Sequence, residues 1–99
     1  MKVSLQEAKL LAKKLGIDLD QVPLQIWKYA IQTETEHLRS LDCDLTKCAL
    51  VSRDHLLEFG ILYYILLQKM EQRLEEHFKG KKKPRVLLPG TTLSSACRR

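Results

Sequence analysis

The chain has 99 residues, of which 44% are hydrophobic and 29% are charged, with only four glycines and three prolines. This length allows one modest hydrophobic core and leaves too little chain for an active-site cleft between two lobes. The composition is typical of a folded, helix-rich domain and excludes a disordered chain.

The positive charge is concentrated at the C-terminus. The net charge is +5, but residues 80–99 hold six basic residues and no acidic one, whereas residues 1–79 hold eleven basic and twelve acidic residues. We therefore expect two parts, a helical domain over residues 1–79 and a basic tail over residues 80–99.

The sequence offers neither an export signal nor a membrane span. Its first residues reach the charges Lys2 and Glu7 with no apolar stretch followed by a cleavage site. The longest apolar run, Ile61–Leu67, is far shorter than the roughly 20 residues that a spanning helix needs. We expect an intracellular protein, cytoplasmic or nuclear, without a membrane partner. Its three cysteines, odd in number and without Cys-x-x-Cys spacing, are expected to be reduced thiols.

The first half of the domain predicts two helices. Ser4 and Glu7 have the spacing of a capping box, and Gly16 suits a left-handed C-cap, so the first helix should end near Leu15. Pro23 fits the first turn of a second helix, which we expect to run to about Ser40. The apolar stripe of this second helix contains Glu34, a carboxylate at a position that the spacing assigns to the core.

The second half predicts two more helices. Asp42 or Asp44 is expected to cap a third helix over roughly Leu45–Glu58. Gly60 predicts a break or kink before a fourth helix over Ile61–Lys79, with one long bent helix as the alternative. The predicted fold is all-α, a compact four-helix domain with an extended basic C-terminal tail.

Three motifs occur in a fixed order along the domain, namely Glu34-Thr35-Glu36-His37, His55-Leu56-x-Glu58 and Tyr63-Tyr64. In this order they make the chain resemble a family of small helical proteins of unknown function from bacteria and large DNA viruses. The resemblance covers residues 4–75, but the family usually has a glycine where this chain has Leu38. It implies an all-α fold and no particular activity. The family's occurrence in large DNA viruses implies a virion component as one role.

The same motifs predict a candidate site. Glu34 and His37, and likewise His55 and Glu58, lie one helical turn apart, where their side chains share a face. On two antiparallel helices these four residues would converge as ligands for Zn, Mn or non-haem Fe. One alternative is a buried Glu34–histidine hydrogen bond that fixes the packing of the helices, and another is a solvated face. No motif for covalent catalysis or phosphate binding is present, so we expect neither an enzyme nor a bound cofactor apart from that metal.

The tail and the fourth helix predict two binding surfaces. The basic residues Lys81, Lys82, Lys83 and Arg85 are suited to an acidic partner such as nucleic acid, bound non-specifically because no aromatic side chain is interleaved with them. After them Val86–Leu88, between two prolines, is expected to extend as a short strand on the bundle or on a partner.

The run Ile61–Leu67 is apolar on every side of its helix, and in so small a domain part of it should contact another subunit, a partner or the folded-back tail. The expected interface residues are Trp27, Ile61, Tyr63, Tyr64 and Leu67. The sequence thus predicts a non-enzymatic binding or structural module that forms a homo-oligomer or binds a protein partner, with a small metal-binding protein as the alternative.

Overall fold

The structure is a computed structural model, and it describes residues 2–37, 41–82 and 86–90. Within these ranges the chain forms four α-helices and one 3-10 turn, and it forms no strand. In chain order they are α1 (Leu5–Leu15), α2 (Leu24–Glu34), η1 (Thr35–His37), α3 (Leu45–Phe59) and α4 (Leu62–Phe78). The predicted all-α class and the four helices are confirmed.

Helix α1 begins and ends as its local sequence predicts. The Ser4 hydroxyl accepts a hydrogen bond from the backbone N–H of Glu7 at 3.0 Å, and the Glu7 carboxylate accepts one from the N–H of Ser4 at 3.3 Å. At the other end Gly16 adopts a left-handed conformation with φ 75°. Both ends therefore have the backbone partners that an isolated helix terminus lacks.

Helix α2 is shorter than predicted. Pro23 stands at its N-cap, but the α-helix ends at Glu34 and gives way to η1, whereas the prediction extended it to Ser40. Thr33 and Thr35 donate their hydroxyl hydrogens to backbone carbonyls of the preceding turn, those of Tyr29 and Gln32. Such back-bonding by β-branched residues competes with the regular helical ladder and favours a tighter turn. Residues 38–40 lie outside the described ranges.

A glycine separates α3 from α4. Asp44 caps α3 by accepting from the N–H groups of Thr46 and Lys47, while Asp42 instead pairs with the Lys47 ammonium at 2.6 Å. Gly60 then takes φ 65° and ψ −164°, a conformation that only glycine adopts readily. The predicted break is confirmed, and the single bent helix is not formed.

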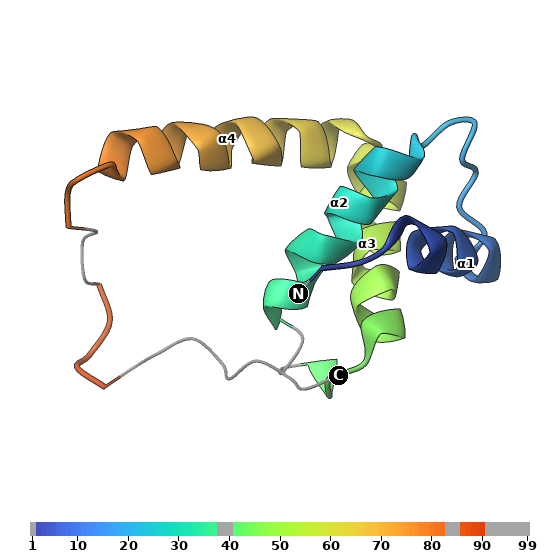
Figure 1. The fold of residues 1–99 in the computed structure, drawn as a ribbon, viewed down its shortest axis with the longest axis horizontal. Coiled ribbons are helices and arrows are strands. Elements are labelled where there is room, and N and C mark those ends of the chain that lie inside the picture. The colour runs from blue at the N-terminus through green and yellow to red at the C-terminus, as the bar shows by residue number, and fades with distance from the viewer. Residues whose placement is uncertain (1, 38–40, 83–85, 91–99) are drawn as a thin grey trace.

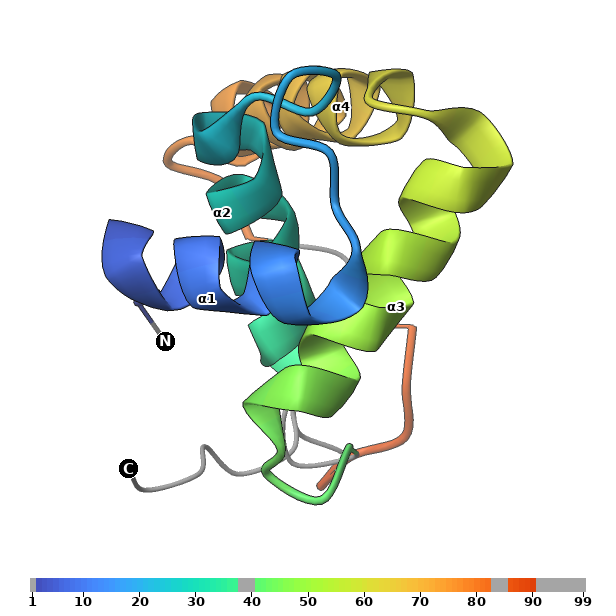
Figure 2. The ribbon, with the colours of Figure 1, turned by 90° about the vertical axis from the view of Figure 1, so that its right-hand side faces the viewer.

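The helices pack around a small apolar core. Helices α2 and α3 lie side by side, and α1 crosses them on one face, as Figure 2 shows. The core consists of Val3, Ala8, Ala12, Trp27, Ala30, Ile31, Ala49 and Tyr64. Trp27 is fully buried, and its indole N–H donates to the carbonyl of Ala8 at 2.9 Å, which ties α2 to α1. The amphipathic faces predicted for the first two helices therefore meet in this core.

Helix α4 is less embedded than a compact bundle would require. It lies across one end of α2 and α3 and then extends away from the other helices (Figure 1). Two apolar residues in its second half, Met70 and Leu74, are about half exposed, at 51% and 48%. The first turns of α4 thus belong to the domain, whereas its last turns project from it.

The remaining described features concern the cysteines, the tail and the membrane. Cys43 takes part in a disulfide bond, so the expectation of three reduced thiols is wrong: an odd number of cysteines still allows one pair. Cys48 is free and buried, and Cys97 lies outside the described ranges.

Val86–Leu88 is exposed and forms no strand against the helices. None of the described helices combines the length and the apolar character needed to cross a membrane.

Candidate functional site

The carboxylate that the sequence places on an apolar stripe is indeed buried. Glu34, the last residue of α2, is 6% exposed. A buried carboxylate is costly unless hydrogen-bond donors surround it. Glu34 is the one carboxylate among the buried residues that the structure describes, so its partners mark a candidate site.

Three helices each supply one side chain to this point. The Tyr64 hydroxyl of α4 donates to Glu34 Oε1 at 3.1 Å. Nδ1 of His55, from α3, lies 3.0 Å from the Tyr64 oxygen and 3.2 Å from Glu34 Oε1. We call this arrangement the Glu34–His55–Tyr64 cluster. It connects α2, α3 and α4 and brings a histidine next to the buried Glu34, whose carboxylate accepts a hydrogen bond from Tyr64.

The hydrogen bonds of the cluster determine where its protons lie. Burial, above all, raises the pKa of Tyr64; the Ser52 hydroxyl acts in the opposite direction, and the charge of Glu34 adds to the rise. Tyr64 therefore stays protonated, and its single hydrogen is directed to Glu34. His55 Nδ1 lies 3.0 Å from the Tyr64 oxygen, so the phenol contacts both the carboxylate and the imidazole.

Aromatic rings cover the solvent side of the histidine. The His55 ring stacks on that of Tyr63, with centroids 4.3 Å apart and planes 18° apart. The ring of Phe59 also stacks on Tyr63, with centroids 6.0 Å apart. The His55 side chain is still 27% exposed, whereas that of Glu34 is only 8% exposed. The imidazole is thus the part of the cluster that reaches solvent.

The four predicted metal ligands are only partly brought together. Glu34 and His55 meet, but Glu58 is exposed on α3, and the side chain of His37 lies outside what the structure describes. Across the described residues, no group of three or more His, Cys, Asp or Glu side chains is placed to hold a metal ion. The third member of the cluster is Tyr64, which the sequence reasoning assigned to an interface instead.

The predicted interface residues divide between core and surface. Trp27 and Tyr64 are buried at 0% and 1% exposure, so they are core residues and cannot anchor a partner; each buries its ring and satisfies its polar atom within the domain. Ile61, Tyr63 and Leu67 are half-buried. The exposed apolar side chains are their neighbours on α4, which were not among the predicted interface residues: Leu62, Leu66, Met70 and Leu74.

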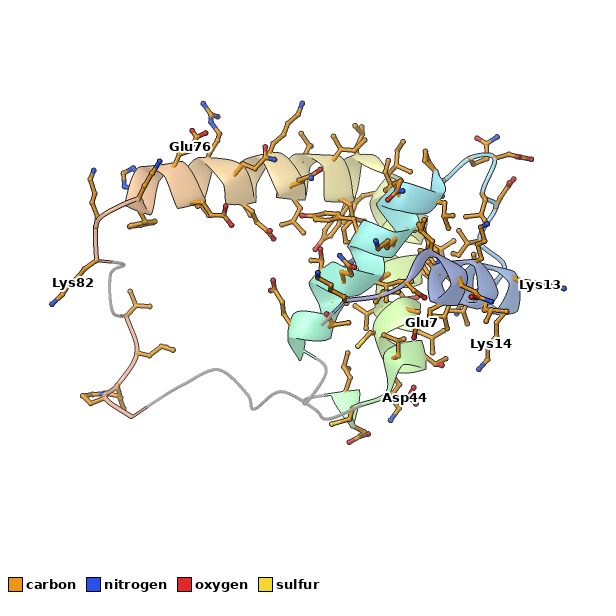
Figure 3. The ribbon with its side chains drawn as sticks, viewed as in Figure 1. Glu7, Lys13, Lys14, Asp44, Glu76 and Lys82 are labelled. Atoms are coloured by element: carbon orange, nitrogen blue, oxygen red, sulfur yellow. The ribbon has the colours of Figure 1, made fainter. Side chains whose placement is uncertain are left out.

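The basic tail is described in part. Lys81 and Lys82 are exposed, and Figure 3 shows Lys82 beyond the end of α4, far from the core. Lys83 and Arg85 lie outside the described ranges. The structure therefore presents at least two of the four predicted cations to solvent.

The chain is a small all-α domain in which a buried carboxylate, an imidazole and a phenol link three helices. It belongs to the DUF5661 family, described as a protein of unknown function, whose family model matches residues 8–73. The matched part contains all three members of the cluster and most of α4. No curated protein and no solved structure matches the chain.

Proposed function

We propose that this domain is a non-enzymatic helical module that self-associates through an exposed apolar ridge on α4. The ridge consists of Leu62, Leu66, Met70 and Leu74, spaced four residues apart, which are 60%, 58%, 51% and 48% exposed. This row is the observation on which the proposal rests. Leu57 and Phe59, at the end of α3, extend the apolar surface at 77% and 62% exposure.

The spacing of the ridge suits contact with another helix. Residues four apart form one continuous ridge on a helix, and two such ridges interdigitate in the commonest mode of helix packing. Soluble monomers seldom leave an apolar row of this length in water, and such rows usually mark interaction sites. A second copy of α4 offers the same ridge, so a two-fold symmetric pairing would cover both.

The chemistry of the core supports a binding role more than a catalytic one. In the Glu34–His55–Tyr64 cluster the Tyr64 hydroxyl contacts both the carboxylate and the imidazole, an arrangement that links three helices. Burial, followed by the charge of Glu34, raises the pKa of the Cys48 thiol, and a protonated buried thiol is a poor nucleophile. The cluster is best suited to holding α4 at a fixed angle to α2 and α3.

The tail would add a second, electrostatic contact. Lys81 and Lys82 follow α4 directly and are exposed, and residues 80–99 contain no acidic residue. Such a segment attracts any acidic surface, nucleic acid included, in a salt-dependent way. We propose that it strengthens the assembly that the ridge begins.

The experiment is a concentration series of the whole chain measured by light scattering after size exclusion. We expect a monomer–dimer equilibrium that Leu66→Ser weakens by about tenfold or more, because each dimer loses two buried leucines. Leu10→Ser on α1 is the matched control, since Leu10 is similarly exposed at 64% but lies off the ridge. A chain that stays monomeric, or a dimer that Leu66→Ser leaves unchanged, would refute the proposal.

A further inference from the structure

We infer that a groove beside the projecting end of α4 receives residues 81–88 of a second copy of this chain. The groove is bounded by η1 on one side and by α4 on the other. Its lining residues are Glu36, Glu71, Leu74, Glu75 and Phe78. The inference rests on the proposed self-association and specifies the acidic surface that the basic tail engages.

The groove has an apolar floor with acidic edges. It encloses about 370 Å³. Leu74 and Phe78 give it apolar side chains, of which Leu74 is 48% exposed. Three carboxylates surround them, and among the described residues no lysine or arginine lines the groove. A complementary ligand would therefore be a segment that combines several cations with a short apolar stretch.

The C-terminal segment of this chain has that combination. Lys81, Lys82, Lys83 and Arg85 are followed at once by Val86, Leu87 and Leu88. Pro84 and Pro89 favour an extended backbone, the form in which a peptide fits a narrow groove. In the structure Val86 is 85% exposed, and it does not line the groove of its own chain.

The lengths allow exchange between two copies. Helix α4 has 17 residues and so is about 25 Å long. If two α4 ridges pair in antiparallel fashion, the tail of one copy starts beside the N-terminal end of the partner's helix. Residues 79–86 extended cover about 26 Å, which brings Val86 to the groove at the far end. Two-fold symmetry then fills both grooves.

The test uses charge reversal in the full chain, with dimer dissociation constants measured by sedimentation equilibrium. One variant reverses the groove through Glu36→Lys with Glu75→Lys, both exposed residues. Another reverses the tail through Lys83→Glu with Arg85→Glu, the two cations nearest to Val86 in the sequence. We expect each to weaken the dimer by about tenfold, since several exposed charge pairs are lost at once. Combining all four substitutions should restore the wild-type constant, because the pairs re-form with inverted signs.

The matched control carries Glu58→Lys with Glu76→Lys. It changes the net charge by the same amount as the groove variant, but both residues lie outside the groove, and Figure 3 shows Glu76 on the outer side of α4. The control should dimerise like the wild type. An equal loss in the control and the groove variant would overturn the inference, as would failure of the combined variant to recover.

Two further outcomes separate the possible occupants. An equimolar mixture of the groove variant and the tail variant should form mixed dimers, because each groove then faces a tail of opposite charge from the other copy. If it forms none, the tail docks within its own chain and the inference fails. If neither reversal changes the dimer dissociation constant and the tail binds DNA in a salt-dependent way, the partner of the tail is nucleic acid. That result overturns the inference and leaves the proposed ridge contact standing, whereas a chain that never dimerises removes both.

Discussion

Tyr64 donates its hydroxyl hydrogen to Oε1 of Glu34 over 3.1 Å, although 30 residues separate the two in the sequence. Both residues are almost fully buried, and His55 lies within hydrogen-bond distance of both. The bond explains why a helix stripe that is otherwise apolar contains a carboxylate. It also fixes the first turns of α4 to the domain, so that the following turns project with a defined orientation.

Removing the Tyr64 hydroxyl should destabilise the fold. Tyr64→Phe keeps the ring but withdraws one of the donors to the buried Glu34 carboxylate, which should lower the free energy of unfolding by about 1–3 kcal/mol. Urea denaturation followed by the fluorescence of Trp27 would measure it. Tyr63→Phe is the control: its ring keeps the stacking on His55, so its effect should stay within about 0.5 kcal/mol. Equal effects of the two variants would contradict the role of the Tyr64 hydroxyl.

The same hydroxyl should make stability depend on alkaline pH. Because burial raises the pKa of Tyr64 above its ordinary value of 10.0, the native state keeps this proton when the unfolded chain releases it. The contribution is therefore complete below about pH 10 and is lost as the pH rises further, with a slope approaching about 1.4 kcal/mol per pH unit. Unfolding free energies of the wild type and of Tyr64→Phe should converge as the pH rises.

Tyr29 does not affect the comparison of the wild type with Tyr64→Phe. Its pKa is also raised, mainly by burial, but it is present in both proteins and cancels in their difference. The groups that face the Tyr64 hydroxyl, Glu34 and His55, are likewise common to both. Two stability curves that fall in parallel above pH 10 would show that Tyr64 is not held protonated by the fold.

The glycine between α3 and α4 should tolerate no side chain without cost. Gly60 has φ 65° and ψ −164°, whereas Gly16 has φ 75° and ψ 29°, a left-handed conformation that other residues adopt at a smaller penalty. A Cβ at either position would meet no atom within 4 Å, so the cost is conformational alone. We expect Gly60→Ala to lower the melting temperature more than Gly16→Ala does. The reverse order would mean that the corner at Gly60 can relax.

Local sequence signals predicted the ends of the helices well. The capping box at Ser4, the glycines at positions 16 and 60 and the cap at Asp44 act within one turn of the backbone, so the sequence alone contains the necessary information. The early end of α2 was missed because the hydroxyl bonds of Thr33 and Thr35, which favour a tighter turn, are only a weak signal in the sequence.

Non-local contacts were harder to predict. Glu34 could be recognised as buried from its position on the stripe, and a histidine partner followed from chemistry. Tyr64 was assigned to an interface because an all-apolar turn shows no preferred face; the signal that was available is that a buried tyrosine needs a hydrogen-bond partner. Trp27 was also assigned to an interface, because aromatic residues are common in both cores and interfaces.

The projecting part of α4 should respond to protein concentration. Residues 70–78 extend beyond the other helices, and their apolar side chains are partly exposed, so their amides should exchange with solvent faster than those of residues 62–67. If the ridge pairs with a second copy, hydrogen–deuterium exchange of this segment should slow as the concentration rises. Exchange of α1 is the internal reference and should not change. A rate in residues 70–78 that is independent of concentration would argue against pairing there.

The central claim is that the ridge on α4 contacts the same ridge of another copy. A mixed sample of isotope-labelled and unlabelled chains allows nuclear Overhauser effects between copies to be separated from those within one copy. The account predicts intermolecular effects that connect the methyl groups of Leu62, Leu66, Met70 and Leu74 across the pair. Intermolecular effects confined to α1, α2 or α3, with none on these four residues, would contradict it.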